Sequence, residues 1–471
     1  MKVSDIRFGT DGWRAVIGET YTFSNLRRAV QAASNVWKRT ERARTVAVGY
    51  DTRFLSQSFA RATAEVLAGN GLRVLLSDGP LPTTAVSLAI RQKKLAGGLV
   101  VTASHNPPEF NGLKVKASFA GPADPEQTSA IESEIDARPV RSLAYDEALK
   151  RRRIVLEDLN TPYVKFLERS VDLPKIRRSS FRVLINPMHG VSAPIFSRLL
   201  CGGRLGVTLM NEKPDVTFGG TAPEPIPRNS KDLIERMRRR QADVGIGIDG
   251  DADRIGAVLP GGRFLYPSEI ISLLALHLVS ARHAQGSMVK TISGSVLINR
   301  VARSLGRRVY ETPIGYKHIC ELQRRSRVLI GGEESGGIGA TSAIPERDGI
   351  LSALLLLEMM AARRQTISKI FAGVESQFGK LSYARRDVAC TPRQKKGFYA
   401  RLLKRPFQQI DGSPVAEIRS YDGVKFIAED ESWLLVRFSG TEPVLRVYVE
   451  SSSPERVERI LRAAQARVRA I

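Results

Sequence analysis

Cysteine and long apolar runs are scarce in this chain, and each absence argues against a class of protein. Three of the 471 residues are cysteines, Cys201, Cys320 and Cys390, and none has the CxxC spacing of a zinc or redox site. We therefore expect no disulfide framework and a cytoplasmic location. The most apolar run, 350–362, is interrupted by Glu358 and is shorter than the roughly 20 residues that span a membrane.

Acidic residues are also in the minority, because 72 lysines and arginines face 48 aspartates and glutamates, a net charge of +24. Such a field attracts phosphorylated metabolites and also nucleic acid. The basic clusters at 151–153 and 236–240 lie far apart, and no aromatic residues interleave with them in a stacking pattern. We expect an arginine-rich solvated surface and no nucleic-acid partner. A basic nucleic-acid-binding protein remains the alternative from a different class.

The length of the chain predicts three or four domains, mostly of the α/β class. Apolar runs at 46–49 and 73–76 have the pattern of short strands, and the helical pattern at 56–68 between them completes a βαβ unit. The pattern changes from about Phe371, where alternation at 433–438 and 444–449 favours antiparallel strands. A basic amphipathic helix is predicted at 454–468, so the last part is expected to be a smaller α+β domain.

Three times, an apolar strand that contains glycine leads directly into a polar loop. The strands are predicted at 97–101, 244–248 and 328–332, and the loops that follow begin at Thr102 and at the acidic residues Asp249 and Glu333. Ligands of α/β sheets gather beyond the carboxyl ends of the strands. Each loop is therefore a candidate part of a site, and three such domains facing one cleft would be a coherent arrangement.

The second of these loops carries three carboxylates at alternate positions, Asp249, Asp251 and Asp253. Alternate residues of an extended segment point the same way, so the three can converge on a hard cation such as Mg²⁺. An EF-hand is excluded because Arg254 replaces the glycine at position six and Pro260 replaces the glutamate at position twelve. A dinucleotide fingerprint is disfavoured because a strand, not a helix, follows. A magnesium site and a solvated acidic turn remain open.

The first loop carries Ser104 with His105 beside it. A serine at the end of a strand can be a nucleophile, a phosphate carrier or an ordinary turn hydroxyl, and the residues alone leave all three open. No GxSxG elbow surrounds Ser104, which argues against an α/β-hydrolase. Lys114 is close enough in sequence to share the same cleft, either as a proton carrier or as a structural lysine.

Two further clusters can bind parts of a phosphorylated sugar. Glu333, Glu334 and Ser335 offer acceptors for vicinal hydroxyls, although a surface loop that caps a helix would use similar residues. The stretch RFSGTEP at 437–443 supplies an arginine fork, hydroxyls and glycine amides for a phosphate, or else forms a hairpin turn. No Walker A motif occurs, which disfavours a P-loop nucleotidase.

Taken together and in this order, the motifs resemble the α-D-phosphohexomutase superfamily, which includes phosphoglucomutases and phosphomannomutases. The matching segments are FGTDGWR at 8–14, TASHNP at 102–107, DGDADR at 249–254, GEESGG at 332–337 and RFSGTEP at 437–443. The resemblance implies three related α/β domains with mixed sheets and a C-terminal α+β domain like the TATA-binding protein. On this chain the implied boundaries are 1–150, 151–256, 257–370 and 371–471.

The resemblance implies an enzyme, a monomer or homodimer, that interconverts hexose 1-phosphate and hexose 6-phosphate through a phosphoserine and a hexose 1,6-bisphosphate. Some members carry a histidine where this chain has Gly337, and the EESG and Tyr316-Lys317 forms look more like glucose-type than glucosamine-type enzymes. Glucose is therefore the expected sugar. A phosphomannomutase and a sugar-bisphosphate synthase are the near alternatives. A haloacid-dehalogenase-type phosphatase, which phosphorylates an aspartate, is a more distant one.

The resemblance also implies a role for each matching residue. Ser104 would be the phosphoserine, and its phosphate would join three magnesium ligands, Asp249, Asp251 and Asp253. The residues around the transferring phosphoryl group would be Arg14, His105, Arg254 and Lys114, the last as the candidate general acid/base. The sugar would contact Tyr316, Lys317, His318, Glu333 and Ser335. The phosphate that is not reacting would be bound by Arg437, Ser439, Gly440, Thr441 and Arg446.

Overall fold

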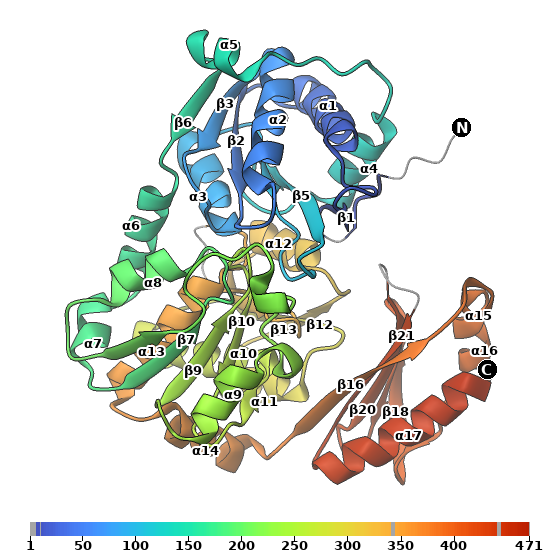
Figure 1. Ribbon diagram of the computed structural model, residues 1–471. Coiled ribbons are helices and arrows are strands. Elements are labelled where there is room, and N and C mark those ends of the chain that lie inside the picture. The colour runs from blue at the N-terminus through green and yellow to red at the C-terminus, as the bar shows by residue number, and fades with distance from the viewer. Residues whose placement is uncertain (1–5, 10, 341–343, 440–443, 471) are drawn as a thin grey trace.

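The computed structural model describes residues 6–9, 11–340, 344–439 and 444–470, which form four sheets with their helices (Figure 1). Three sheets are mixed, and the C-terminal sheet is antiparallel. The C-terminal unit, orange to red in Figure 1, stands to one side of the others. None of the helices in the described ranges combines the length and the hydropathy of a transmembrane segment.

The first sheet carries the strand that leads to Ser104. Its strands are β1 (Trp13–Val16), β2 (Thr45–Tyr50), β3 (Arg73–Ser77), β4 (Gly97–Val101), β5 (Phe110–Ala117) and β6 (Ile154–Glu157). They lie in the order β1-β5-β4-β2-β3-β6, in which β4, β2, β3 and β6 are parallel. Its helices are α1 (Phe23–Thr40), α2 (Ser56–Gly69), α3 (Thr83–Lys93), α4 (Pro125–Ser133) and α5 (Tyr145–Lys150). The βαβ unit expected from the sequence is confirmed in β2, α2 and β3.

The second sheet carries the aspartate loop. Its strands are β7 (Arg182–Asn186), β8 (Gly206–Leu209), β9 (Val244–Ile248), β10 (Ile255–Val258) and β11 (Phe264–Leu265), in the order β11-β10-β9-β7-β8. Its helices are α6 (Asn160–Ser170), α7 (Leu173–Arg178), α8 (Ala193–Leu200) and α9 (Lys231–Arg238), with 3₁₀ turns at Phe218–Gly220 and Pro227–Asn229.

The third sheet carries the glutamate loop. Its strands are β12 (Ser287–Thr291), β13 (Val309–Thr312), β14 (Val328–Gly332) and β15 (Ile338–Gly339), in the order β13-β12-β14-β15. Its helices are α10 (Pro267–Arg282), α11 (Val296–Ser304), α12 (Tyr316–Arg325), α13 (Gly349–Arg363) and α14 (Ile367–Phe378).

The three predicted strand-and-loop repeats are confirmed, and the structure adds a feature that they share. Each of β4, β9 and β14 is followed by an antiparallel neighbour, β5, β10 and β15 respectively. The polar loops therefore connect adjacent antiparallel strands, which returns the chain to the same edge of the sheet. This geometry fixes both ends of each loop on the sheet.

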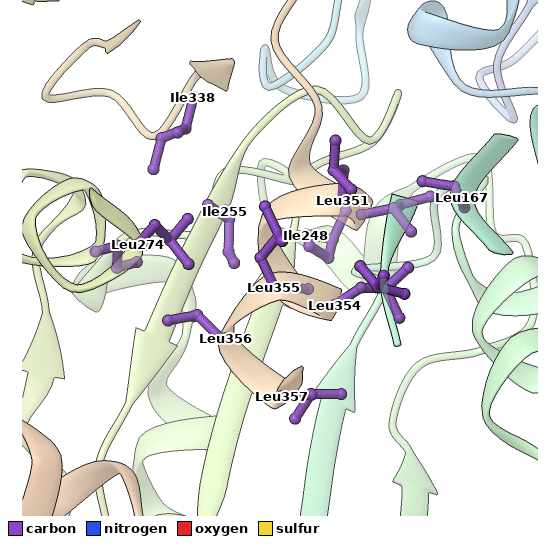
Figure 2. Close-up of a cluster of buried hydrophobic side chains, with 14 of the residues drawn as sticks. Leu167, Ile248, Ile255, Leu274, Ile338, Leu351, Leu354, Leu355, Leu356 and Leu357 are labelled. Atoms are coloured by element: carbon purple, nitrogen blue, oxygen red, sulfur yellow. The ribbon is translucent and has the colours of Figure 1, made fainter. Parts of the chain in front are cut away.

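Helix α13 packs against both the second and the third unit, in a hydrophobic core that also reaches residues of the first unit. Its leucines, including Leu351 and Leu355, pack with Ile248 of β9, Ile255 of β10 and Leu274 of α10 (Figure 2). Burying a leucine side chain contributes about 2 kcal/mol, so this helix is a large part of the stability of both units. The apolar run at 350–362 is thus a core helix, and Glu358 within it pairs with Arg282.

The C-terminal unit has a core of its own. Its strands are β16 (Ser382–Ala389), β17 (Gln409–Ile410), β18 (Ser413–Arg419), β19 (Val424–Ala428), β20 (Trp433–Phe438) and β21 (Val444–Ser451). Its helices are α15 (Pro392–Lys395), α16 (Phe398–Lys404) and α17 (Pro454–Ala470), of which α17 packs on β16 and β21. A small apolar cluster that includes Ile292 and Trp433 joins it to the third unit, and Arg300 pairs with Glu431 at the same interface.

Asp348 caps the N-terminus of α13 and is fully enclosed. Its carboxylate accepts hydrogen bonds from the backbone N–H of Leu351 at 2.8 Å and from the hydroxyl of Tyr163 at 2.9 Å. Burial raises the pKa of Asp348 from 3.8 to about 7, although these hydrogen bonds oppose the shift. The protonated form is therefore favoured in the folded state, and this group's contribution to stability is lost as the pH rises from about 4 to about 7.

We expect the variant Asp348→Asn to be more stable than the wild type at pH 8 and close to it at pH 4.5. Asparagine keeps an acceptor for the helix cap and removes the cost of burying a negative charge. Thermal unfolding midpoints measured from pH 4.5 to 8 test this. Asp172→Asn is the matched control: Asp172 caps α7 at the surface, and hydrogen bonding to Lys175 lowers its pKa, so no gain is expected at pH 8. A wild-type midpoint that exceeds that of Asp348→Asn at pH 8 would contradict the assignment.

Candidate active site

Ser104 lies directly beyond β4, and its hydroxyl points to the aspartate loop of the second unit. The Oγ donates a hydrogen bond to Oδ2 of Asp249 at 2.8 Å, and the backbone N–H donates to Oγ1 of Thr102 at 2.8 Å. The residue is buried and has a φ of +53°. A left-handed conformation at a residue other than glycine costs about 1 kcal/mol or more, so the backbone at Ser104 is held under strain.

A buried arginine that the sequence analysis did not single out holds this loop in shape. Nη2 of Arg53 donates to the carbonyl oxygens of Ser104 and Asn106, both at 2.6 Å, and Nη1 donates to that of Pro107 at 2.8 Å. Nε of the same guanidinium lies 3.2 Å from Oδ2 of Asp51. One charged group thus fixes the backbone of the Ser104 loop through several of its carbonyl oxygens.

The aspartate loop brings its three carboxylates together, as the alternation predicts. Asp249, Asp251 and Asp253 are buried, and their ligand atoms lie within 4.8 Å of one another. Among the described residues, none donates a hydrogen bond to Oδ1 of Asp251 or Oδ1 of Asp253, although both atoms are buried. Converging carboxylate oxygens with open lone pairs are the donor set of a hard divalent cation, so these residues fit Mg²⁺.

Lys114 of β5 lies against the same carboxylates. Its Nζ is 2.7 Å from Oδ2 of Asp251, 2.5 Å from Oδ2 of Asp253 and 3.0 Å from Oδ2 of Asp11. Burial opposes the charge of Lys114, but the three carboxylates outweigh it and raise its pKa. The side chain is therefore a protonated ammonium in this arrangement, and its charge balances the carboxylates of two loops.

Arg347 connects the carboxylates of three units, and the sequence analysis missed it. Its Nε lies 2.8 Å from Oδ2 of Asp253, its Nη1 3.4 Å from Oε2 of Glu333, and its Nη2 pairs with Asp11. Asp11 belongs to the FGTDGWR segment, so a sequence motif already pointed to its part of the chain. No motif points to Arg347, which only stands in a charged triplet, 346–348, ahead of an apolar helix.

The glutamate loop packs directly on the aspartate loop. A backbone bridge joins Arg254 to Gly337, and the N–H of Ile255 donates to the carbonyl of Gly336 at 3.0 Å. Gly336 has a φ of +99°, and a Cβ there would lie 2.6 Å from the carbonyl oxygen of Ile255. Only glycine allows this approach, so the glycine of the motif serves the contact between two loops.

Within the glutamate loop the two acidic side chains are used differently. Glu333 is buried, and desolvation raises its pKa to about 7 despite the nearby Arg347. Glu334 accepts hydrogen bonds from Ser293 at 2.5 Å and Thr291 at 3.2 Å, so it holds the loop to its own unit. Ser335 is half-buried.

The residues expected around the phosphoryl group also lie close to Ser104. Nδ1 of His105 is 3.3 Å from Oγ of Ser104 and 3.5 Å from Nη1 of Arg14, which donates to Oδ1 of Asn106 at 2.8 Å. Burial, with the charges of Arg254 and Arg14, holds the pKa of His105 well below its ordinary value. The protonated imidazole is therefore disfavoured in this arrangement. Arg254 lies next to the triplet, and its Nε is 3.8 Å from Oδ1 of Asp253.

What we call the 312–318 loop runs from the end of β13 into the first turn of α12, where its three expected sugar contacts have different environments. Tyr316 is buried in the core of the third unit, its hydroxyl donates to Oε1 of Gln323 at 3.1 Å, and Arg347 lies over its ring at 5.5 Å. Lys317 and His318 are half-buried. Tyr316 thus supports Arg347, whereas its two neighbours are more accessible.

The phosphate motif lies on the C-terminal sheet, where Arg437 of β20 is opposite Arg446 of β21. Nε of Arg437 donates to Oδ1 of Asp422 at 2.7 Å, and Ser439 is buried. Gly440 and Thr441 lie outside the described residues. Arg437 lies beside the third unit through Asp422, which also contacts Ile314, while the loops of the first three units meet directly around Ser104 and Asp253.

Domains of one known protein family match all four units of the chain. The alpha/beta/alpha domains I, II and III of phosphoglucomutase/phosphomannomutase match residues 5–141, 161–262 and 266–378, and the C-terminal domain of that family matches residues 400–466. The probable phosphoglucosamine mutase of Methanopyrus kandleri is 30% identical over 96% of this chain and 95% of its own length.

Solved structures give the same result. The crystal structure of a putative phosphomannomutase from Thermus thermophilus has a TM-score of 0.86 and 36% identity, over 98% of this chain and 99% of its own. An N-acetylphosphoglucosamine mutase of Aspergillus fumigatus, solved with GlcNAc-6P and magnesium, shares the fold with a TM-score of 0.58 and 15% identity over 98% and 96% of the two chains. The chain belongs to the α-D-phosphohexomutase superfamily and is an intramolecular phosphotransferase of the phosphohexomutase type.

Proposed function

We propose that this enzyme interconverts glucose 1-phosphate and glucose 6-phosphate through a phosphoserine at Ser104 and a glucose 1,6-bisphosphate intermediate. The observation that carries the proposal is the 2.8 Å contact of Oγ of Ser104 with Oδ2 of Asp249. It sets a strained, buried hydroxyl against three carboxylates suited to a cation. The proposal follows the division of the chain into units at 1–150, 151–256, 257–370 and 371–471, each of which supplies one loop.

The aspartates at 249, 251 and 253 would hold Mg²⁺ together with an oxygen of the phosphoserine. When bound, the ion neutralises negative charge on the transferring phosphoryl group. The two buried oxygens without a donor among the described residues, on Asp251 and Asp253, support this assignment. The Aspergillus fumigatus relative solved with magnesium supports it as well.

In the transfer step, a sugar hydroxyl attacks phosphorus, a new P–O bond forms, and the bond from phosphorus to Oγ of Ser104 breaks. The hydroxyl proton leaves the sugar, and Oγ of Ser104 regains a proton, so the balance is kept. Lys114, whose Nζ lies 2.7 Å from Oδ2 of Asp251, and His105, whose Nδ1 lies 3.3 Å from Oγ of Ser104, are the groups placed to carry these protons. Arg14 and Arg254 would bind the phosphoryl oxygens.

The bisphosphate must then turn over so that its other phosphate faces Ser104. Glu333 and Ser335 would bind the sugar hydroxyls in both orientations, with Lys317, His318 and the buried Tyr316 shaping that side of the site. The non-reacting phosphate would be bound by Arg437, Ser439, Gly440, Thr441 and Arg446. Because this phosphate-binding site is separate from Ser104, one active site can accept the sugar in either orientation.

Glucose is the proposed sugar because the EESG segment and the Tyr316-Lys317 pair resemble those of glucose-type enzymes. The names of the relatives cover glucosamine, mannose and glucose. Mannose is the second candidate, supported by the name of the Thermus thermophilus relative. No nucleic acid or membrane has a role in this proposal.

We expect kcat/KM for glucose 1-phosphate to exceed that for mannose 1-phosphate about threefold or more, and that for glucosamine 1-phosphate about tenfold or more. Coupled assays of the three sugars, each with its own 1,6-bisphosphate as activator, measure this. If kcat/KM were highest for mannose 1-phosphate, the enzyme would be a phosphomannomutase and the proposal of glucose would be wrong. Accumulation of bisphosphate as the final product would indicate a bisphosphate synthase.

We expect Ser104→Ala to retain less than about 1% of mutase activity, because the residue carries the phosphoryl group. Intact mass should show an excess of about 80 Da on the wild type and none on the variant. Ser133→Ala, which changes an exposed serine of α4, is the matched control and should keep full activity. Substantial mutase activity in a folded Ser104→Ala variant would refute the phosphoserine.

We expect the wild type to bind one Mg²⁺ per chain, and Asp251→Asn to bind it at least about tenfold more weakly, because a carboxylate ligand is lost. Isothermal titration with MgCl₂ after chelator treatment measures this without substrate. Asp232→Asn removes an exposed carboxylate of the same unit and serves as control. Equal affinity in wild type and Asp251→Asn would place the ion elsewhere.

A further inference from the structure

The turn between β18 and β19 carries a carboxylate that reaches two functional segments at once. Oδ1 of Asp422 accepts the hydrogen bond from Nε of Arg437 at 2.7 Å, and Oδ2 accepts one from the backbone N–H of Ile314 at 2.7 Å. Arg437 belongs to the phosphate motif of the C-terminal unit, whereas Ile314 belongs to the 312–318 loop of the third unit. A single side chain therefore links the two segments across the interface between these units.

The backbone around Asp422 is built for this position. Gly423 follows it with a φ of +87°, and a Cβ at Gly423 would lie 2.7 Å from the carbonyl oxygen of Val436 and 2.9 Å from Cβ of Arg437. Because only glycine fits there, the turn can close against β20 directly beside Arg437. The contact thus depends on the local fold and is not a chance meeting of two surface side chains.

The contact also determines which N–H groups of the Arg437 guanidinium can bind a ligand. Asp422 takes Nε of Arg437, and no described residue accepts a hydrogen bond from its two Nη groups. A guanidinium held at Nε presents its terminal N–H groups as a fork, and that fork matches two oxygens of a phosphate. Fixing the side chain in advance reduces the ordering cost when the phosphate binds.

On the other side, Asp422 fixes the backbone just before α12. Ile314 is followed by Gly315, whose φ is +126°, and then by Lys317 and His318 on the first turn of the helix. An N–H anchored at Ile314 limits how far this turn can move. The two half-buried side chains proposed to contact the sugar thus share an anchor with the phosphate-binding arginine.

A neighbouring cluster adds polar contacts at the same interface. Glu311 near the end of β13 accepts hydrogen bonds from Nη1 of Arg419 and the hydroxyl of Tyr421, both at 2.7 Å. The buried ammonium groups of Lys290 and Lys425 each lie 3.6 Å from Oε2 of the same carboxylate. The segments that carry Asp422 and Ile314 are therefore also held together by residues close to each of them in the chain.

We propose that Asp422 is a positioning residue that couples the phosphate grip of Arg437 to the 312–318 loop, so that both ends of the bound sugar phosphate are placed together. The proposal rests on the function proposed above and adds a residue that the family motifs do not contain. It implies that losing the carboxylate weakens substrate binding although Asp422 itself does not contact the substrate.

The test compares KM and kcat for glucose 1-phosphate in variants of the full-length enzyme. Asp422→Ala should raise KM about tenfold or more with kcat within about threefold, because binding in ground and transition state is lost together. Asp422→Asn should raise KM about threefold or more, since the amide can accept only on one side. Added to Arg437→Gln, Asp422→Ala should raise KM by less than about threefold further, because the two act through one contact.

Glu431→Gln is the matched control, because it weakens the Arg300 ion pair at the same interface without touching either segment. Its KM should stay within about twofold of the wild type. Thermal midpoints report folding, and Asp422→Asn carries the test if Asp422→Ala does not fold. Three results with an active wild type would overturn the coupling alone. They are an unchanged KM in the Asp422 variants, KM increases that multiply in the double variant, and a rise in KM in Glu431→Gln equal to that in Asp422→Ala. A wild type without mutase activity would overturn the proposed function and this coupling together.

Discussion

The candidate active site depends on the balance of buried charge around Arg347. Asp11, Asp253 and Glu333 come from three different units, and each would be costly to bury as a lone carboxylate. The guanidinium offsets this cost for all three and thereby requires the units to meet at one point. Lys114 of β5 does the same for Asp251 and Asp253. Removing one partner of such a buried set typically costs about 3–5 kcal/mol of stability. The same ion pairs therefore determine both the geometry of the site and the packing of the units.

Much of this arrangement was readable from the sequence because its signals are local. The alternation of Asp249, Asp251 and Asp253 predicts convergence, and the strands ahead of the three polar loops match β4, β9 and β14 residue for residue. Arg53, Arg347 and Asp422 could not be found in this way. Each acts through partners that are distant in the chain, such as Asp422 with Ile314, and a lone arginine or aspartate has no spacing that reveals its partner. The domain boundaries, the sugar and the individual catalytic roles remain predictions.

The interfaces between the units differ in kind. The second and third units share the leucine-rich helix α13, which leaves little freedom between the aspartate and glutamate loops. The C-terminal unit has its own core and meets the third unit through a small apolar cluster, a few ion pairs and the Asp422 contacts. Polar contacts of this kind can be exchanged at low cost, whereas a buried leucine helix cannot.

The sharing of α13 has a consequence for how the chain can be divided. Residues 161–262 match a domain of the family on their own, yet the leucines that cover their sheet are supplied by a helix about a hundred residues later. A fragment cut at residue 262 would expose a broad apolar face to water and would tend to self-associate. Mixed with a separately made piece carrying α13, it would regain its cover. The second unit thus depends on a distant helix for part of its cover, so a division of the chain at residue 262 would separate a sheet from the leucines packed on it.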